Sequence, residues 1–435
     1  MNFWVGVGVL VLGLIVSIGL HELGHLLPAK RFGVYVPQYF IGFGPTLWST
    51  KRGETEYGVK LLPLGGYVRL IGMFPPKDHT TSASRGRTWF SRVADDARTY
   101  SQSEIPEGSE HRAFYALSTP KKLAVMFGGP VVNLILAVVL FAVVLTGFGT
   151  ATATNKLGSV SECVPEGMAE CAAQDPAAPA VAAGFRPGDR VLEWGGQEVS
   201  TWEEVSSAIR AGGDAPTEVV IDRGGEHLTL TVTPTIAARP VIGDDGQVEL
   251  DAAGEPVLAD APYVGIGAAV ELVPAPLGEV PGVVTDVFTG TVQVVLSLPA
   301  RLVAIANAVF TDAERDPSVV GLVGVGRFAG EIASLPAAEY GLKERTADML
   351  SLLGSLNMAL FVFNMIPLLP LDGGHIAGAL YEGARRRLAA WSGRTSPRYA
   401  DTARLMPLTY MVFAVLLGMS VLLAVADIVK PVTLG

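Results

Sequence analysis

The residues with the clearest chemical potential are His21, Glu22 and His25, which follow an uncharged apolar run from Phe3 to Leu20. On a helix, positions i and i+4 share one face, so both imidazoles can reach one Zn²⁺ while Glu22 serves as the general base for water. Ionisable groups at membrane depth are costly and are usually functional. The alternative is a pair of polar helix-end residues in a water-filled cavity. The spacing favours zinc held by His21 and His25.

A catalytic zinc takes three protein ligands and keeps a fourth position open, so a third ligand must come from another segment. A later apolar segment runs into Asn364-Met365-Ile366-Pro367-Leu368-Leu369-Pro370-Leu371-Asp372-Gly373-Gly374-His375, where two prolines break the helix. Broken helices at membrane depth occur where backbone lines a cavity. We therefore predict Asp372 as the third ligand and His375 as the second choice; an Asp that caps the Gly-Gly turn is the alternative. The other histidines lie in polar segments and are expected on the surface: His79, His111 and His227.

The composition indicates a membrane protein. Of 435 residues, 49% are apolar and only 17% are charged, and the apolar residues are concentrated in long runs. The aliphatic content excludes a disordered chain, and two cysteines cannot build a disulfide-dominated fold. The net charge of −10 disfavours nucleic acid as a main partner.

The fold class that we predict is a polytopic α-helical membrane protein with four transmembrane helices, an inserted extracytoplasmic β-rich domain and a membrane-associated β-hairpin. About 20 apolar residues cross a bilayer, which gives spans at residues 1–28, 122–148, 348–375 and 405–428. Lys and Arg are in excess in 29–121 and 376–404, whereas acidic residues are in excess in 149–347. Cytoplasmic loops keep basic residues, so both termini are expected outside and the active site towards the cytoplasm.

Residues 283–312 are a fifth apolar candidate, but they contain Asp286, Gln293, Pro299 and Arg301. An interfacial amphipathic helix suits this mixture. The chemistry agrees, because the ligands of the first and third spans can meet only if an odd number of crossings separates them. A crossing at 283–312 would leave Asp372 on the opposite face from His25.

Three membrane motifs in this order resemble the site-2 proteases, which are intramembrane zinc metalloproteases of the M50 type, and especially the bacterial regulator-of-sigma-E protease subgroup. The motifs are HExxH, Gly128-Gly129-Pro130-Val131-Val132-Asn133 and Asn-x-x-Pro followed by Leu-Asp-Gly. The resemblance implies that His21, His25 and Asp372 hold one zinc ion, that Glu22 is the base and that Asn364 lies near the substrate backbone. We assign Asn133 to substrate binding on the same grounds.

Residues 54–72 alternate as two short strands around a Pro/Gly-rich turn and are too apolar for a plain cytoplasmic hairpin. A sheet edge beside the zinc would pair with unwound substrate backbone; a hairpin that only packs on the helices is the alternative. The family has a re-entrant hairpin here, which adds Gly65, Gly66 and Tyr67 to the predicted substrate-binding residues. Residues 77–112 are polar, which predicts a flexible loop, and residues 313–347 are predicted to be a gate or linker.

The outer region, residues 157–282, resembles a single PDZ domain on the run Gly184-Phe185-Arg186-Pro187-Gly188-Asp189-Arg190-Val191. A PDZ groove adds an extended peptide as an edge strand, whereas a β-rich spacer or size filter would bind nothing. Residues 236–282 do not repeat the Pro-Gly-Asp pattern, so we count one copy. Cys163 and Cys171 lie in this region, where a disulfide is expected; two free buried thiols are the alternative.

These observations favour a zinc metalloendopeptidase that cleaves the transmembrane segments of other membrane proteins in the bacterial inner membrane. Family resemblance implies single-pass substrates trimmed first by a site-1-type protease, including anti-sigma factors and signal-peptide remnants. The alternatives are a non-catalytic PDZ-bearing membrane scaffold and a membrane metal transporter or sensor.

Overall fold

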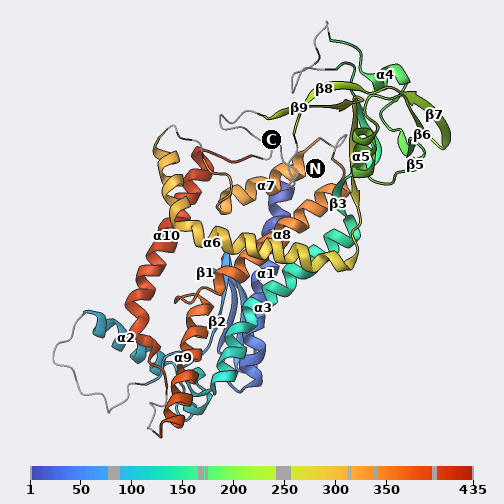
Figure 1. Ribbon diagram of the computed structural model, residues 1–435. Helices are drawn as coiled ribbons and strands as arrows, with labels where there is room; N and C mark the ends of the chain where they lie inside the picture. The colour runs from blue at the N-terminus through green and yellow to red at the C-terminus, as the bar shows by residue number, and fades with distance from the viewer. Residues whose placement is uncertain are drawn as a thin grey trace. The chain divides into compact units, whose positions relative to one another are not determined.

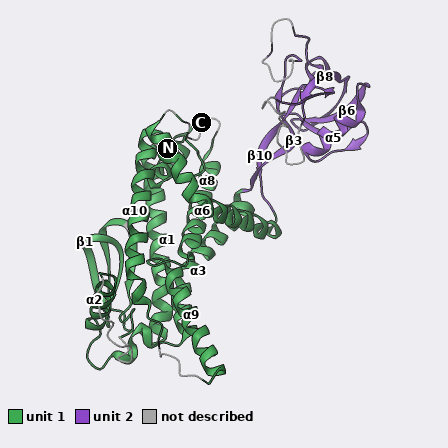
Figure 2. Cartoon of the chain, turned by 60° about the vertical axis from the view of Figure 1, so that its left-hand side comes forward, with its two compact units in different colours: residues 1–148, 276–435 green, residues 149–275 purple. Residues whose placement is uncertain are grey.

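The chain folds as two compact units. The computed structural model describes residues 2–76, 89–164, 171, 175–241, 256–311, 313, 315–336, 340–393 and 399–433. Unit 1 consists of residues 1–148 and 276–435, and unit 2 consists of residues 149–275 (Figure 2, green and purple). Unit 1 holds the long helices and a small sheet, whereas unit 2 is rich in strands. Both chemistry-bearing segments that the sequence singles out lie in unit 1.

Within the described residues, unit 1 has five helical segments that are long and apolar enough to cross a membrane. In lipid every backbone polar group must be bonded internally, so uncharged aliphatic runs of this length form helices. The segments are Phe3–Arg31, Thr119–Phe148, Leu277–Phe310, Leu342–Asn364 and Thr402–Val429. The first and the fourth are the single helices α1 and α8. Each of the others combines a helix with a short turn: α3 (Thr119–Val143) is followed by the π-helical turn η3 (Val144–Phe148), the 3-10 turn η4 (Leu277–Glu279) precedes α6 (Val280–Phe310), and the 3-10 turn η5 (Thr402–Leu405) precedes α10 (Met406–Val429). The chain is therefore a polytopic membrane protein that also carries β-sheets.

Helix α6 runs in a different direction from α3 and α8. It contacts both of them and also α10, and Figures 1 and 2 show it lying across them. Pro299 lies inside this helix, and Arg301 pairs with Asp316 at 2.6 Å.

Residues 313–347, which the sequence suggests are a gate or linker, contain a further helix, α7 (Leu322–Ser334), and the first turns of α8. Helix α7 packs on α1, α8 and α10. Small residues allow the close approach to α1, because a Cβ on Gly6 would collide with the Ala329 carbonyl. This stretch is thus part of the helix packing and more than a connection.

The third span ends earlier than the sequence predicts. Helix α8 stops at Asn364, and α9 (Asp372–Trp391) begins at Asp372, so the expected single span 348–375 is two helices joined by the turn 365–371. The prolines at 367 and 370 account for the break, since proline lacks the N–H of a continuing helix. Helix α9 also occupies much of residues 376–404, which the sequence suggests are only a loop.

The small sheet of unit 1 is larger than the predicted hairpin. Strand β1 (Gln38–Arg52) and strand β2 (Thr55–Arg69) are each fifteen residues long, and the tight turn lies at Gly53 and Glu54, whereas the predicted turn was the Pro/Gly-rich part of 54–72, which belongs to β2. Residues 38–41 lie opposite 56–59 on one side and opposite 66–69 on the other. Residues 66–69 are paired on that side only, so in the described part of the chain they form an edge of this sheet.

The polar segment 77–112 is not simply a flexible loop. Residues 77–88, including His79, lie outside the described part, but α2 (Trp89–Ser103) and the 3-10 turns η1 (Glu110–Arg112) and η2 (Phe114–Ala116) follow. Arg98 of α2 donates to Asp401, with the shortest N–O distance being 2.7 Å. This long-range ion pair stabilises a helix that local polarity alone does not reveal.

Unit 2 is built on a sheet in the order β10-β3-β4-β6-β7, with β5 beside β4 and a separate hairpin of β8 and β9. It begins at residue 149 and ends at residue 275, both before the predicted limits of 157 and 282, because β3 belongs to it and 276–282 belong to unit 1. The elements are β3 (Thr150–Val160), α4 (Pro179–Ala183), β4 (Arg190–Trp194), β5 (Gln197–Glu198), α5 (Trp202–Gly212), β6 (Thr217–Arg223), β7 (Glu226–Val232), β8 (Thr235–Pro240), β9 (Leu258–Tyr263) and β10 (Ile266–Val273).

Buried side chains from several of these elements form one core, including Phe185, Val191, Trp194, Val205 and Ile221. Helix α5 opens with a reciprocal capping box between Thr201 and Glu204, which satisfies N–H groups at its first turn.

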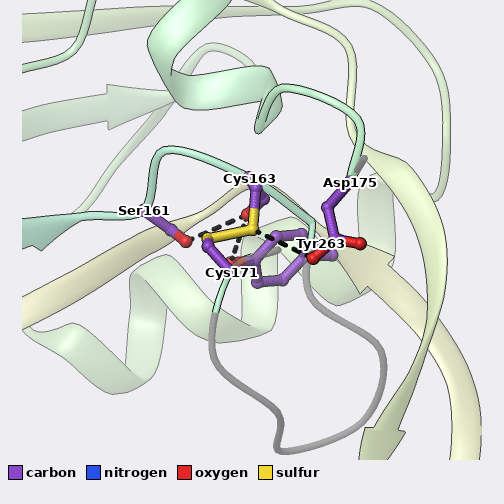
Figure 3. Close-up of a disulfide and its surroundings, with 5 residues drawn as sticks. All are labelled: Ser161, Cys163, Cys171, Asp175 and Tyr263. Carbon is purple, nitrogen blue, oxygen red and sulfur yellow. Dashed lines mark hydrogen bonds between the residues drawn. A yellow bond between two sulfur atoms is a disulfide. The ribbon is translucent and has the colours of Figure 1, made fainter. Parts of the chain in front are cut away.

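Cys163 and Cys171 form the disulfide that the sequence predicts (Figure 3). The carbonyl of Cys163 accepts hydrogen bonds from the Ser161 hydroxyl at 2.9 Å and from the Tyr263 hydroxyl at 3.5 Å. Asp175 lies beside the Cys163 sulfur. The disulfide therefore closes a short loop after β3, and the hydrogen bond from Tyr263 to the Cys163 carbonyl joins this segment to the end of β9.

Candidate metal centre

Three potential metal ligands converge between α1 and the start of α9. The Nε2 atoms of His21 and His25 are 3.3 Å apart, and they lie 3.4 Å and 3.3 Å from Asp372 Oδ2. Among the described residues this is the one group of three or more His, Cys, Asp or Glu side chains placed to hold a metal. The structure thus brings the three predicted ligands together.

The separations fit zinc. Tetrahedral coordination at about 2.0–2.1 Å places neighbouring ligand atoms about 3.3 Å apart, and two imidazoles with one carboxylate form a common catalytic zinc set. The atom Asp372 Oδ2 is buried and has no hydrogen-bond partner among the described residues, although a buried carboxylate oxygen normally has one. Three protein ligands also leave a fourth position for water or substrate. The residues present therefore suit the ion that the sequence implies.

The turn before α9 places Asp372. Within it, the Leu371 N–H donates to the Leu368 carbonyl at 3.0 Å, and Asp372 then opens α9, where a helix N-terminus favours a carboxylate. Gly373 and Gly374 pack directly against the backbone of this turn, so that a Cβ on Gly374 would lie 2.5 Å from the Leu369 nitrogen. The Gly-Gly pair lets the turn fold tightly enough to bring Asp372 to the histidines.

Helix α3 packs closely against the two imidazole rings. A Cβ on Gly24 would collide with Gly128, and a Cβ on Gly129 would collide with both histidine rings. The Val125 carbonyl of α3 lies 2.8 Å from His25 Nδ1. A carbonyl only accepts hydrogen bonds, so Nδ1 carries the proton and Nε2 presents its lone pair to the ligand cluster.

Glu22 lies between the metal-ligand cluster and the edge of the small sheet. The backbone N–H of Val68 points at its carboxylate, and a Cβ on Gly66 would lie 2.9 Å from its Cγ. Tyr67, between them, stacks on Phe40 and Phe43. Sequence reasoning places residues 65–67 near the site but does not find Val68 or Val125, because both act through backbone groups that any residue type carries.

Three other predicted residues lie in different surroundings. Asn364 ends α8 and is not part of the ligand cluster. His375 is also outside this cluster and lines a small cavity with Lys122 and Glu382, so its prediction as an alternative ligand is wrong. Asn133 is fully buried and its Nδ2 lies 3.1 Å from His21 Nδ1. Asn133 therefore contacts a predicted ligand, and the substrate contact predicted for it stays a prediction.

Residues 9–408 match the family model described as "Peptidase family M50". The zinc metalloprotease Rip1 of Mycobacterium bovis is 32% identical over the full length of both chains. Metalloprotease MmpA of Caulobacter vibrioides is 27% identical over 87% of this chain and 86% of its own length. Zinc metalloprotease RasP of Oceanobacillus iheyensis is 26% identical over 87% of this chain and 90% of its own. The chain therefore belongs to peptidase family M50, the site-2 proteases, and is a multi-pass bacterial membrane metalloprotease.

Proposed function

We propose that this protein is an intramembrane zinc metalloendopeptidase that hydrolyses peptide bonds in transmembrane segments of other membrane proteins, in regulated intramembrane proteolysis. The observation that carries the proposal is the convergence of His21, His25 and Asp372 at 3.3–3.4 Å with Glu22 beside them. These three side chains hold the zinc ion.

Zinc bound there supplies a Lewis acid that polarises the scissile carbonyl and activates water. Glu22 acts as the general base: it accepts a proton from water and delivers it to the leaving amine. The Val68 N–H holds the Glu22 carboxylate in place, and the absent side chain of Gly66 leaves room for it. Asn364, at the end of α8, orients the substrate backbone.

The sheet edge at residues 66–69 presents the substrate. A helical peptide shields its amides, so it must unwind before hydrolysis, and an open strand edge stabilises unwound backbone by β-addition. This edge begins beside Glu22, and the stacking of Tyr67 on Phe40 and Phe43 makes it rigid. Gly65, Gly66 and Tyr67 are the substrate-binding residues of this proposal.

Four of the five long apolar segments span the membrane, and α6 lies at its interface. The transverse course of α6 supports this (Figure 1), as do its polar residues Asp286 and Arg301. With α6 excluded, one crossing separates α1 from α8, which is what the meeting of His25 with Asp372 requires. Both termini are then extracytoplasmic, and the metal centre opens towards the cytoplasm.

Unit 2 is a PDZ-like domain that either binds an extended peptide or filters substrates by size. Its Pro-Gly-Asp turn is fixed by Asp189, which accepts hydrogen bonds from the Arg186 N–H and from Arg223, each at 2.8 Å. Substrates are single-pass proteins already shortened by a site-1-type protease. Anti-sigma factors and signal-peptide remnants are substrates of this kind.

The test measures bound zinc and the cleavage of a model transmembrane peptide by the full-length wild type, Glu22→Gln and Asp372→Ala in detergent. We expect about one zinc in Glu22→Gln with cleavage lowered about 10²–10⁴-fold, and neither zinc nor cleavage in Asp372→Ala. Absence of zinc from the wild type, or full cleavage by Glu22→Gln, would overturn the proposal in favour of a scaffold or a metal transporter.

A further inference from the structure

The proposed zinc chemistry makes no use of the amide of Asn133, although this amide contacts a predicted zinc ligand. Asn133 lies on α3, has no exposed surface, and places its Nδ2 3.1 Å from Nδ1 of His21. Its Oδ1 is buried without a hydrogen-bond partner among the described residues. We propose that Asn133 is a positioning residue that fixes the tautomer and ring orientation of His21 for zinc binding.

The argument starts from the requirement that both histidines present Nε2 lone pairs. An imidazole that binds a metal through Nε2 carries its proton on Nδ1, and that N–H needs an acceptor. For His25 the acceptor is the Val125 carbonyl at 2.8 Å. For His21 the group within hydrogen-bond distance of Nδ1 is the Asn133 amide.

The amide supplies the acceptor when its oxygen faces the ring. The nitrogen and oxygen of an Asn side chain exchange places by a half-turn about its last bond, and the correct orientation is assigned from the hydrogen bonds. With Nδ2 towards His21 the amide would donate to Nδ1, which forces the ring proton onto Nε2 and blocks coordination. With Oδ1 towards His21 the amide accepts from Nδ1–H, and Nε2 is free to bind zinc.

The packing of α3 makes this contact specific. Asn133 and Gly129 are four residues apart and share one face of the helix. Gly129 lies so close beneath the rings that any Cβ there would collide with them. Helix α3 therefore fixes both ligands, through the Val125 carbonyl for His25 and through the Asn133 side chain for His21.

Asn357 of α8 provides a matched control. It is also an Asn with no exposed surface and an Oδ1 without a hydrogen-bond partner. Its Nδ2 donates to the Ser17 hydroxyl at 3.0 Å and to the Leu353 carbonyl at 2.8 Å, so it contacts no ligand. Replacing each Asn by Leu removes an equally buried amide, but only one of the two amides touches His21.

The experiment measures the zinc affinity of full-length wild type, Asn133→Leu, Asn133→Asp and Asn357→Leu in detergent, by competition with a chromophoric chelator. Thermal unfolding of the metal-free proteins establishes which variants are folded. Loss of a hydrogen-bond partner of a metal-bound histidine typically costs 10–100-fold in metal affinity. We expect that loss for Asn133→Leu, wild-type affinity for Asn357→Leu, and restored affinity for Asn133→Asp, whose carboxylate accepts from Nδ1–H.

A second measurement does not depend on affinity. The visible absorption of Co²⁺ placed in the site reports its coordination, and we expect a changed spectrum for Asn133→Leu and an unchanged one for Asn357→Leu. If the Leu variant at position 133 does not fold, Asn133→Ala replaces it. Wild-type affinity and spectrum without the Asn133 amide, or equal losses for the two Asn variants, would overturn the inference.

This inference rests on the zinc role proposed for His21, and the two fail separately. If Asp372→Ala retains its zinc, the ligand assignment itself is wrong. If Asp372→Ala loses zinc but Asn133→Leu does not, only the role of Asn133 is wrong.

Discussion

Two aspartates of unit 1, the fully buried Asp427 and the partly buried Asp372, show how surroundings separate a structural carboxylate from a reactive one. Asp427, near the end of α10, has no exposed side-chain surface, and Arg315 donates to its Oδ1 at 2.6 Å. The backbone N–H groups of Gly321 and Gly324 complete its hydrogen bonds. At Asp372, by contrast, Oδ2 has no hydrogen bond and faces two imidazole nitrogens.

The difference indicates what each carboxylate does. Asp427 has a donor at both oxygens, and those donors come from the segment before α7 and from the first turn of α7, so its charge joins both to α10. The open oxygen at Asp372 is costly unless a cation occupies the space. Burial alone therefore identifies neither role; the set of donors around each carboxylate does.

Substituting Asn for Asp372 or for Asp427 should separate the metal-binding role from the structural role most clearly. In Asp372→Asn a weak ligand replaces a strong one, so we expect loss of bound zinc and of measurable cleavage. The metal-free variant should unfold at or slightly above the wild-type temperature, because it removes a carboxylate charge whose Oδ2 has no donor among the described residues. Metal analysis and thermal unfolding with a chelator present measure both quantities; retained zinc contradicts the ligand role.

Asp427→Asn should do the reverse. Removing one partner of a buried ion pair leaves Arg315 uncompensated, which costs about 3–5 kcal/mol in the free energy of unfolding. Zinc content per folded molecule should not change. Denaturant unfolding in detergent measures the loss, and an unaltered unfolding midpoint would show that the pair contributes no stability.

Gly129→Ala tests how closely α3 must approach the ligands. The added Cβ collides with both histidine rings, and forcing a methyl group into a packed site typically costs about 1–3 kcal/mol. We expect lower zinc affinity, because the rings must move. Gly8→Ala is the control, since a Cβ there meets nothing within 4 Å; equal effects of the two variants on zinc affinity would refute the interpretation.

Gly66→Ala probes the base without touching a ligand. The new Cβ would lie 2.9 Å from Glu22 Cγ, so Glu22 must shift by a few tenths of an ångström. We expect a reduced kcat with unchanged zinc content. Steady-state cleavage together with metal analysis distinguishes this from Gly129→Ala, and a kcat equal to that of the wild type would argue against contact between the sheet edge and Glu22.

The smallest effect concerns unit 2. Burial alone would raise the pKa of Asp189, but hydrogen bonds from Arg223 and the Arg186 N–H outweigh it and hold the pKa below its ordinary value. The resulting stability is present above about pH 3.9, the ordinary pKa of Asp, and is lost as the pH falls towards the folded value. Hydrogen exchange of the β4 and β6 amides measures it, and Arg223→Met should weaken the pH dependence.

Sequence-based prediction succeeds in this molecule where the interactions are local in the chain and fails where they join distant segments. The HExxH pair could be predicted because positions i and i+4 meet within one helix. Asp372 could be predicted because prolines indicate a helix break wherever they occur. Helices α2 and α9 were missed, since their sequences are polar and contacts such as Arg98 with Asp401 stabilise them. The first strand of the sheet was missed because its partner residues lie up to thirty-one positions away.

The sequence by itself determined the apolar helices, the zinc-binding pair on α1 and the carboxylate that completes it, because residue type and local spacing specify these. Only the tertiary structure decided that Asn133 meets a predicted ligand, that Val125 and Val68 lie against His25 and Glu22, and that Asp427 has donors at both oxygens while Asp372 Oδ2 has none among the described residues. Each of these contacts depends on which backbone or side-chain group a distant helix or strand places within about 3 Å. Tertiary packing decides which group that is.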